Sequence, residues 1–453
     1  MAESILTPSR TEVELTRRQR LRAVMASTIG STIEWYDFNL YGLAAAVYLG
    51  KLFFPTRDPV VGTLAALGTL GVGYVARPIG AGLFGHFGDR IGRKATLIVT
   101  LVLMGLSTFF IGLLPTHERI GTAAPILLIL LRVCQGLAVS GEWGGALVLT
   151  AEWSSVRRRG FFSAWPVLGV PAGAALAVLA LQISTALLGQ DSYWGWRLPF
   201  LISLVLVVVG VYIRLGVLDT PVFAKLLEER RIERLPVLSL LRHDFDRVVV
   251  LVLALAGVLT IGIIQSSFAL TYTIDYLHLP RGRMFTFQLI AAIVGIFAFL
   301  FFGWLSDRIG RKRMFGIGVV ALALFAFPYW IMLDSRQTLL VLLAFVLELS
   351  IGGMMQGPFG AIAAEAFTGR RRYSGATLSY QLGAVIFGGP APVIALALLN
   401  TYHSTVPIAV YVLIASFISF IAFLLIKERS RQDLSIEYDD LDRVGVPRAI
   451  SPV

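Results

Sequence analysis

Twelve apolar stretches, each about as long as a bilayer is thick, run through this 453-residue chain. A helix needs about 20 apolar residues to cross a membrane, and helices satisfy the backbone polar groups that lipid cannot. Apolar residues make up 56% of the chain and charged residues 15%, which is outside the range of soluble globular proteins. We therefore predict an all-α polytopic membrane protein with spans centred near residues 37, 72, 105, 137, 172, 207, 259, 294, 323, 352, 386 and 416.

Two sequence repeats divide the chain into halves. The charged turn GHFGDRIGRK from Gly85 returns as GWLSDRIGRK from Gly303, and AEWSSVRRR from Ala151 returns as AEAFTGRRR from Ala364. We expect two pseudo-symmetric six-helix bundles. The predicted divisions are an N-terminal tail (1–23), a first bundle (24–217), a central loop (218–246), a second bundle (247–427) and a C-terminal tail (428–453).

Basic residues cluster at the two ends and in the even-numbered loops. Because such residues stay on the cytoplasmic side, we predict that both termini are cytoplasmic. The first span is long, rich in Tyr and Trp, and contains acids with no small-residue cleavage site after it, so we predict that it is retained and is not a signal peptide. The net charge of +11 is then explained by topology and contact with membrane lipid, not by nucleic-acid binding. The single cysteine, Cys134, excludes an intrachain disulfide.

These features resemble the major facilitator superfamily and, within it, the metabolite:proton symporters, which include transporters of osmolytes, 2-oxoglutarate, citrate and shikimate. The resemblance implies a substrate site near the midplane between the halves, reached alternately from each side. We expect a monomer in a bacterial cytoplasmic membrane. One departure is Asp219, where the family usually has Glu. The narrower match rests on TIEWYDFNLYG (32–42), RVCQGLAVSGEWGGA (132–146), GVPAG (169–173), WGWRLPF (194–200) and DTPVF (219–223).

The paired turns predict a conformational gate. Their glycines allow close helix approach and tight reversal, and their aspartates suit helix termini. We expect ion pairs Arg93–Glu152 and Arg311–Glu365 that break and re-form as the halves move; the alternative is a basic loop that only sets topology. The predicted gate residues are Gly85, Asp89, Arg90, Gly92, Arg93, Glu152, Gly303, Asp307, Arg308, Gly310, Arg311 and Glu365.

Charged residues inside the spans predict the coupling site, because charge at membrane depth is costly and persists where it faces a cavity or a partner. A rise of about 1.5 Å per residue predicts that Asp37 lies near Arg132, and that Arg77 lies near Glu34 or Glu142. Burial disfavours a charged carboxylate while a nearby arginine favours it, so such an acid can act as a proton switch. The alternative is a structural salt bridge. The predicted proton-coupling residues are Asp37, Glu34, Glu142 and Arg132.

Polar groups of both halves are candidate substrate ligands. In the second half, Ser266, Ala269 and Thr273 align with Glu34, Asp37 and Tyr41, so we expect proton handling in the first half. The predicted substrate-binding residues are Arg77, Arg132, Tyr41, Gln135, Gln265, Ser266, Tyr380, Gln381 and Glu348.

We therefore expect a proton-coupled symporter that imports a small organic metabolite, with the two intramembrane arginines favouring a carboxylate. The alternatives are a symporter of zwitterions such as proline or betaine, an exporter or uniporter of the same fold, and a non-transporting membrane sensor. The sequence contains no metal-ligand cluster, phosphate-binding loop or nucleophile arrangement, so we expect neither an enzyme nor a cofactor beyond the coupling proton.

Overall fold

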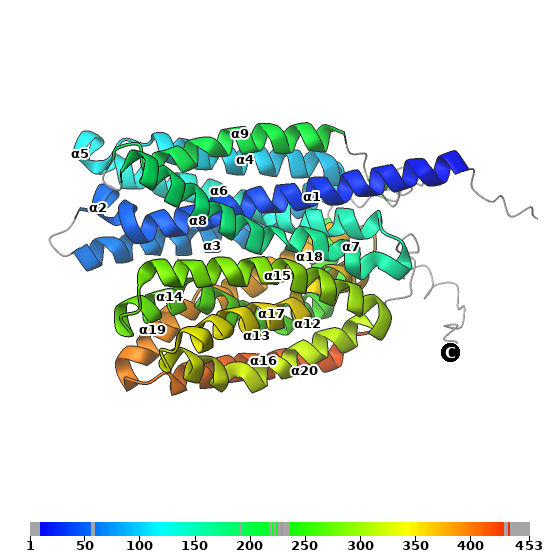
Figure 1. Cartoon of the computed structure of the whole chain (residues 1–453). Helices are drawn as coiled ribbons and strands as arrows, with labels where there is room; N and C mark the ends of the chain where they lie inside the picture. The colour runs from blue at the N-terminus through cyan, green and yellow to red at the C-terminus, as the bar shows by residue number, and fades with distance from the viewer. Residues whose placement is uncertain are drawn as a thin grey trace, which may run out of the picture.

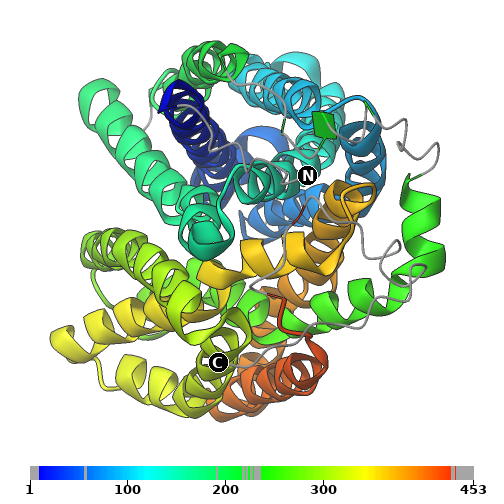
Figure 2. The ribbon, with the colours of Figure 1, turned by 90° about the vertical axis from the view of Figure 1, so that its right-hand side faces the viewer.

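The fold is a pair of helical bundles lying side by side (Figures 1 and 2). The computed structural model describes residues 10–429 apart from 56–58, 190–191, 217–219, 221–222, 225–227 and 229–235, together with Leu434. Within these ranges every regular element is a helix. One bundle is blue to green in Figure 1 and the other is green to red, so each is formed by one half of the sequence.

The first bundle is formed by long helices with short connecting turns. Its elements are α1 (Arg10–Ala44), η1 (Ala45–Leu49), α2 (Gly50–Phe53), α3 (Pro59–Arg90), α4 (Arg93–Leu113), α5 (His117–Ile120), α6 (Ala123–Glu152), η2 (Val156–Arg158), α7 (Arg159–Val167), α8 (Gly169–Leu188) and α9 (Arg197–Leu215). Helix α1 begins inside the predicted tail, and its first turns project beyond the bundle in Figure 1.

The second bundle begins after a short helix, α11 (Pro236–His243), which lies in the predicted central loop. Its elements are α12 (Phe245–Ala254), α13 (Ala256–Ile263), η3 (Ile264–Phe268), α14 (Ala269–Thr271), η4 (Tyr272–Tyr276), α15 (Arg281–Ile309), α16 (Arg311–Asp334), α17 (Thr338–Ala366), α18 (Arg372–Gly383), η5 (Ala384–Gly388), α19 (Ala391–Tyr402) and α20 (Val406–Leu425). The segments η3, η4 and η5 are π-helical turns, which often occur at functional sites.

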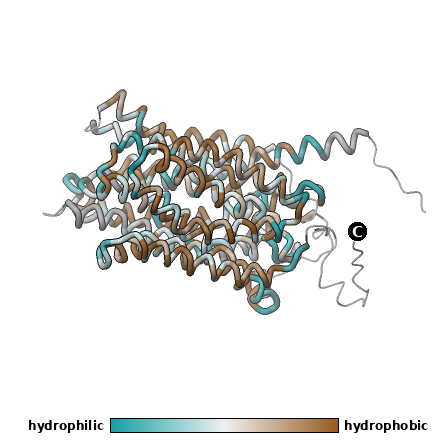
Figure 3. The backbone as a smooth tube through the Cα atoms, turned by 60° about the horizontal axis from the view of Figure 1, so that its bottom comes forward, coloured by the Kyte–Doolittle hydropathy of each residue, from teal (hydrophilic) through white to brown (hydrophobic). Residues whose placement is uncertain are grey.

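Apolar residues form the middle of the helices and hydrophilic residues gather at their ends (Figure 3). Each of the twelve expected centres falls in a helix. Among the described residues, ten helical segments are long and apolar enough to cross a membrane. The other two expected spans are α1 and α3, which are 35 and 32 residues long. The all-α polytopic fold is thus confirmed, while the predicted division boundaries stay predictions.

The two halves meet mainly at one end of the molecule. We call this end the termini face, because α1 begins there and α3, α9 and α20 end there (right in Figure 1). Helix α18 of the second half packs against α3 and α6, while α7 of the first half packs against α15 and α17. These crossed contacts relate the halves by the same pseudo-symmetry as the sequence repeats.

Candidate functional site

Two buried arginines of the first half lie against aromatic rings instead of acids. The Arg77 guanidinium lies 4.2 Å from the Tyr74 ring centre and 4.7 Å from that of Phe38, and Arg132 lies 3.9 Å from the Tyr41 ring centre. Neither arginine has a carboxylate within 4.0 Å among the described residues. Their charges are stabilised only partly by the ring faces, so this region favours an anion.

A narrow pocket lies between α3 and α6 beside these arginines. Glycines let the helices approach closely: a Cβ at Gly73 would lie 3.0 Å from the Arg132 guanidinium. The pocket therefore brings together three of the predicted substrate-binding residues, Arg77, Arg132 and Gln135. Its lining residues are Phe38, Gly73, Arg77, Met104, Arg132, Gln135, Gly136 and Val139.

Asp37 is fully buried, but no ion pair joins it to Arg132 among the described residues, although the sequence predicts that the two lie close together. Its Oδ1 accepts a hydrogen bond from Ser203 Oγ of α9 at 2.6 Å. Arg132 instead donates to Gln135 Oε1 at 2.7 Å. The helical rise gives the depth of a residue but not its direction around the helix axis, so it does not determine which residues pair.

Glu142 binds an arginine that the predicted site omits. Arg214 of α9 contacts both carboxylate oxygens of Glu142, one of them at 2.8 Å, and the Thr100 hydroxyl donates to the same group at 3.2 Å. Of the two acids predicted as neighbours of Arg77, Glu142 therefore pairs with Arg214 instead. The available signal was Arg214 itself, a charged residue in the last turn of an apolar helix.

Glu34 is buried close to this pair, and the charges of Arg77 and Arg214 both act on it. It forms no ion pair within 4.0 Å among the described residues. Its Oε2 has no hydrogen-bond partner there. The structure thus places Glu34 in the electrostatic neighbourhood of Arg77 without a direct contact.

The predicted polar ligands of the second half are not equivalent to one another. Gln265 donates to the backbone oxygen of Phe345 at 3.2 Å, whereas Ser266 is exposed and donates to its own helix. Gln381 and Glu348 are buried, and among the described residues neither amide atom of Gln381 nor the Oε2 atom of Glu348 has a hydrogen-bond partner. Of the predicted ligands in the second half, Gln381 and Glu348 are therefore better placed to form hydrogen bonds with a substrate.

Tyr380 lies at the contact between the halves. Its ring stacks on Trp143 of α6 with 3.5 Å between ring centres. Both side chains are buried. Tyr380, which the sequence predicts to be a substrate ligand, therefore packs against the first half in this structure.

Asp89 joins α3 to the start of α18 in the other half. Its two carboxylate oxygens accept the backbone N–H groups of Tyr373 at 3.1 Å and Ser374 at 2.9 Å. A carboxylate at a helix N-terminus is stabilised by the free N–H groups and the helix dipole. The close approach requires Gly85, since a Cβ there would lie 2.9 Å from the Ser374 Cα.

Asp307 makes the same contact in the opposite direction. It accepts the N–H groups of Gly160 at 2.8 Å and Phe161 at 2.9 Å, at the start of α7. A Cβ at Gly303 would lie 2.6 Å from the Ala164 Cβ. Each half thus places an aspartate on a helix N-terminus of the other.

Both predicted ion pairs of the gate are present. Arg93 Nη2 lies 3.4 Å from Glu152 Oε1, and Arg311 contacts Glu365. The turns between the paired helices reverse at Gly92 and Gly310, whose φ angles are 122° and 102°. These angles are disfavoured for side chains other than glycine, as the sequence predicts.

Two further arginines complete these clusters and were not predicted. Arg372 Nη1 lies 2.7 Å from Glu152 Oε1, and Arg159 Nη1 lies 2.6 Å from Glu365 Oε1. Each is the last arginine of its AExxxxRRR repeat, seven residues after the glutamate, so the repeat itself carried the signal. We call Asp89, Arg93, Glu152 and Arg372 the first charge cluster, and Asp307, Arg311, Glu365 and Arg159 the second charge cluster.

Arg90 and Arg308 do not belong to the clusters. Both are exposed on the termini face, and the Arg308 guanidinium lies 4.0 Å from the Trp304 ring centre. The structure therefore gives no support to their predicted place in the gate.

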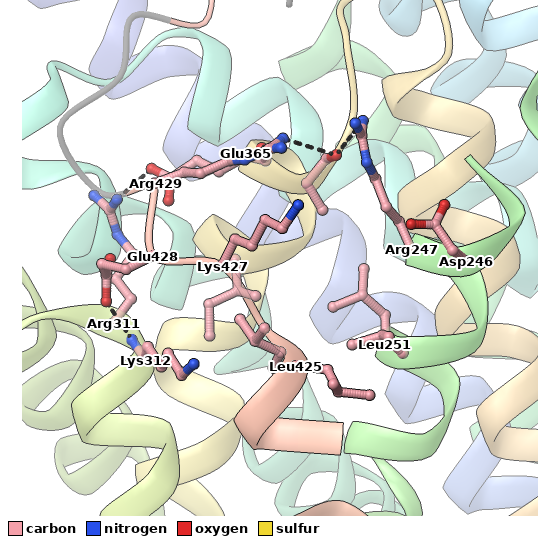
Figure 4. A pocket seen from close by; sticks show the side chains of 14 residues that line it. Asp246, Arg247, Leu251, Arg311, Lys312, Glu365, Leu425, Lys427, Glu428 and Arg429 are labelled. Carbon is pink, nitrogen blue, oxygen red and sulfur yellow. Dashed lines mark hydrogen bonds and ion pairs between the residues drawn. The ribbon is translucent and has the colours of Figure 1, made fainter. Parts of the chain in front are cut away.

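A wider pocket opens beside the second charge cluster at the termini face (Figure 4). Arg311, Lys312 and Lys427 lie on its walls with Glu365 and Glu428. None of the residues predicted to bind substrate lines it. We therefore place the candidate binding site at the arginines between α3 and α6.

Two helical bundles around buried charges, with a closed set of crossed contacts at one face, define a multi-pass membrane protein of the transporter class. The sequence model of the Major Facilitator Superfamily matches residues 27–389 and 290–442. The chain belongs to this superfamily, as its motifs predict. This membership also agrees with the expectation that the chain is not an enzyme.

Relatives cover almost the whole chain. The inner membrane metabolite transport protein YhjE of Escherichia coli K12 is 37% identical over 92% of this chain and 96% of its own length. The shikimate transporter of the same organism is 35% identical over 95% and 100%. The proline/betaine transporter of Salmonella typhimurium LT2 is 32% identical over 91% and 84%.

A solved structure shows the same fold. The proton:xylose symporter XylE bound to 6-bromo-6-deoxy-D-glucose superposes with a TM-score of 0.77 and covers 94% of this chain and 99% of its own. The two sequences are 15% identical, so this likeness concerns the fold alone.

Proposed function

We propose that the protein is a proton-coupled symporter that imports a small organic carboxylate across a bacterial cytoplasmic membrane. The observation that carries this proposal is the pair of buried arginines, Arg77 and Arg132, which have no carboxylate within 4.0 Å among the described residues. Buried cations are costly unless something neutralises them. A substrate carboxylate supplies the missing charge.

The coupling ion follows from Asp37. A buried carboxylate without a basic partner among the described residues is easily neutralised by a proton, because burial disfavours its charged form. A proton taken up there leaves the arginines as the dominant charge of the pocket. Proton and carboxylate binding thereby favour one another.

The orientation of the chain in the membrane indicates which side is closed in this conformation. Basic residues concentrate on the termini face, which the positive-inside rule makes cytoplasmic. The two charge clusters then hold the transporter closed toward the cytoplasm. Import requires both clusters to open after substrate and proton have bound.

The names of the relatives support a metabolite substrate, but the compounds in those names differ in their charged groups. Shikimate carries a carboxylate alone, whereas proline and betaine also carry a cationic nitrogen. The buried acid Glu348, which has no basic partner among the described residues, favours a zwitterion as the second candidate, because it could face such a nitrogen. Shikimate is favoured by the two arginines.

Purified protein in proteoliposomes tests the proposal. We expect uptake of one of five labelled compounds (shikimate, 2-oxoglutarate, citrate, proline and glycine betaine) to rise at least tenfold when an inward proton gradient is imposed, and to collapse with a protonophore. Arg77→Gln should abolish the uptake, while Arg90→Gln, which changes an exposed arginine outside the pocket, should not. Uptake that does not change with the imposed proton gradient would contradict symport.

A further inference from the structure

A single tyrosine fills a hole between the two halves at the termini face. Tyr373 lies in the first turn of α18, in the second half, and is fully buried. A Cβ at Gly88 of α3 would lie 2.4 Å from its ring, and a Cβ at Gly145 of α6 would lie 2.3 Å from its hydroxyl oxygen. A larger residue at either glycine would therefore occupy the space that the tyrosine fills.

The hydroxyl group of Tyr373 forms a hydrogen bond across the boundary between the halves. It donates to the backbone oxygen of Gly141 at 2.6 Å. Gly141 and Gly145 are one turn apart on α6, and the missing side chain of Gly145 leaves this oxygen open to a second donor. A carbonyl oxygen can accept two hydrogen bonds, so the tyrosine is satisfied without disrupting α6.

The pseudo-symmetric contact has no such side chain. Gly160 and Tyr373 occupy the same position of the AExxxxRRR repeat, directly after its last arginine. Both backbone N–H groups bind an aspartate of the other half, at 2.8 Å for Gly160 and 3.1 Å for Tyr373. A Cβ at Gly160 would lie 2.7 Å from the backbone oxygen of Gly303, so that contact has no room for a side chain. The tyrosine is thus an addition to the duplicated motif.

Opening of the termini face must withdraw the ring from its hole. Withdrawal exposes a buried aromatic side chain and breaks the hydrogen bond to Gly141, and both changes cost free energy. Tyr380, two turns further along α18, stacks on Trp143 of α6. The contacts of both tyrosines with α6 must therefore be lost when α18 moves away from the first half.

We propose that Tyr373 holds the termini face closed, and that its ring must leave the hole formed by Gly88 and Gly145 before the face can open. Its hydrogen bond to Gly141 must break in the same step. The proposal rests on the proposed function only for the side of the membrane, since the positive-inside rule makes this face cytoplasmic. It adds a neutral side chain to a gate that the sequence motifs describe by charges and glycines alone.

Gly88→Ala tests the hole, with Gly82→Ala as the matched control. Both change a glycine of α3 to alanine, but a Cβ at Gly82 meets nothing within 4 Å among the described residues outside its own helix backbone. Spin labels on cysteines at the exposed positions Arg22 and Arg308, in a chain whose Cys134 is replaced by serine, report the distance between the halves. We expect the ratio of open to closed populations to rise at least tenfold in Gly88→Ala and to stay within twofold of the parent chain in Gly82→Ala.

Tyr373→Phe tests the hydroxyl group separately, because it removes one hydrogen bond and keeps the ring. The net contribution of one such bond predicts about a fivefold rise in the ratio of open to closed populations. Substrate or pH is first adjusted so that the parent chain shows both states. In a Tyr373→Ala chain the ring is absent, so the further change Gly88→Ala should alter the ratio less than twofold.

Distance distributions that are the same for Gly88→Ala and Gly82→Ala would overturn the proposal. An effect of Gly88→Ala that persists in the Tyr373→Ala chain would also overturn it, because the alanine would then act on α3 and not on the ring. If Tyr373→Ala does not fold, the comparison of Tyr373→Phe with the parent chain takes its place, and an unchanged ratio overturns the proposal. Failure of the proposed function would appear elsewhere, as a wild-type protein that accumulates none of the five compounds while the distances still respond to Gly88→Ala.

Discussion

At the scale of single residues, the buried acids of the first half differ in their partners. Glu142 contacts an arginine through both carboxylate oxygens, whereas Asp37 accepts a hydrogen bond from the Ser203 hydroxyl and has no ion pair among the described residues. An acid that pairs with a buried arginine neutralises the charge of that arginine, whereas an acid without a basic partner does not. Neutral substitutions of Asp37 and Glu142 should therefore have different effects on the protein.

Asp37→Asn should separate proton coupling from transport. The asparagine keeps the shape and the hydrogen bond from Ser203 but cannot bind or release a proton. We expect accumulation driven by a pH gradient to fall to the level seen with protonophore, while counterflow exchange persists. Unchanged accumulation in proteoliposomes would remove Asp37 from the coupling role.

Glu142→Gln should destabilise the fold. It leaves Arg214 buried without its carboxylate, and breaking a buried pair from one side costs about 3–5 kcal/mol. We expect a clear fall in the thermal midpoint of the purified protein. Glu118→Gln, which neutralises an exposed glutamate, is the control and should leave the midpoint unchanged; equal midpoints for the two variants would show that the pair is not structural.

At the scale of helices, the two charge clusters bind the ends of one half to the helix starts of the other. Each contains two ion pairs within a half and one between halves. The pairs Arg372–Glu152 and Arg159–Glu365 cross the boundary. The pairs are buried, so solvent and salt screen them little. Removal of one glutamate therefore acts directly on the balance between closed and open states.

Glu152→Gln should open the termini face. Spin labels attached to cysteines at the exposed positions Arg90 and Arg308, in a chain whose own Cys134 is replaced by serine, report the separation of the halves. A loss of about 3 kcal/mol in the closed state changes a population ratio more than a hundredfold, so we expect longer distances to dominate. Glu118→Gln is again the control, and an unchanged distance distribution would show that the first charge cluster does not hold the face closed.

The helices and their contacts also show which features of the structure could be predicted from the sequence. Apolar length was enough for the helices, and the duplicated motifs were enough for the pairs Arg93–Glu152 and Arg311–Glu365, because a repeated motif implies a repeated contact. The partners of Asp37 and Glu142 could not be predicted, because Ser203 and Arg214 lie on α9 and their approach depends on how the helices are rotated. Depth along a helix is readable from spacing, and rotation is determined by packing.

At the scale of the whole molecule, the crossed contacts predict that the halves move as rigid bodies. Asp89 and Asp307 anchor opposite pairs of helices, so a rocking motion that opens the termini face must break both charge clusters together. The free energies that the clusters contribute to the closed state should then add, as they do for separate sites without shared partners.

The double variant Glu152→Gln/Glu365→Gln measures this additivity. With the labels at positions 90 and 308, the change in free energy between closed and open populations should equal the sum of the two single changes to within about 0.5 kcal/mol. The populations of the singles must first be brought into range, by substrate or pH, so that both states are visible. A double variant no more open than either single would mean that one cluster opens alone, and the halves would then bend instead of rocking as units.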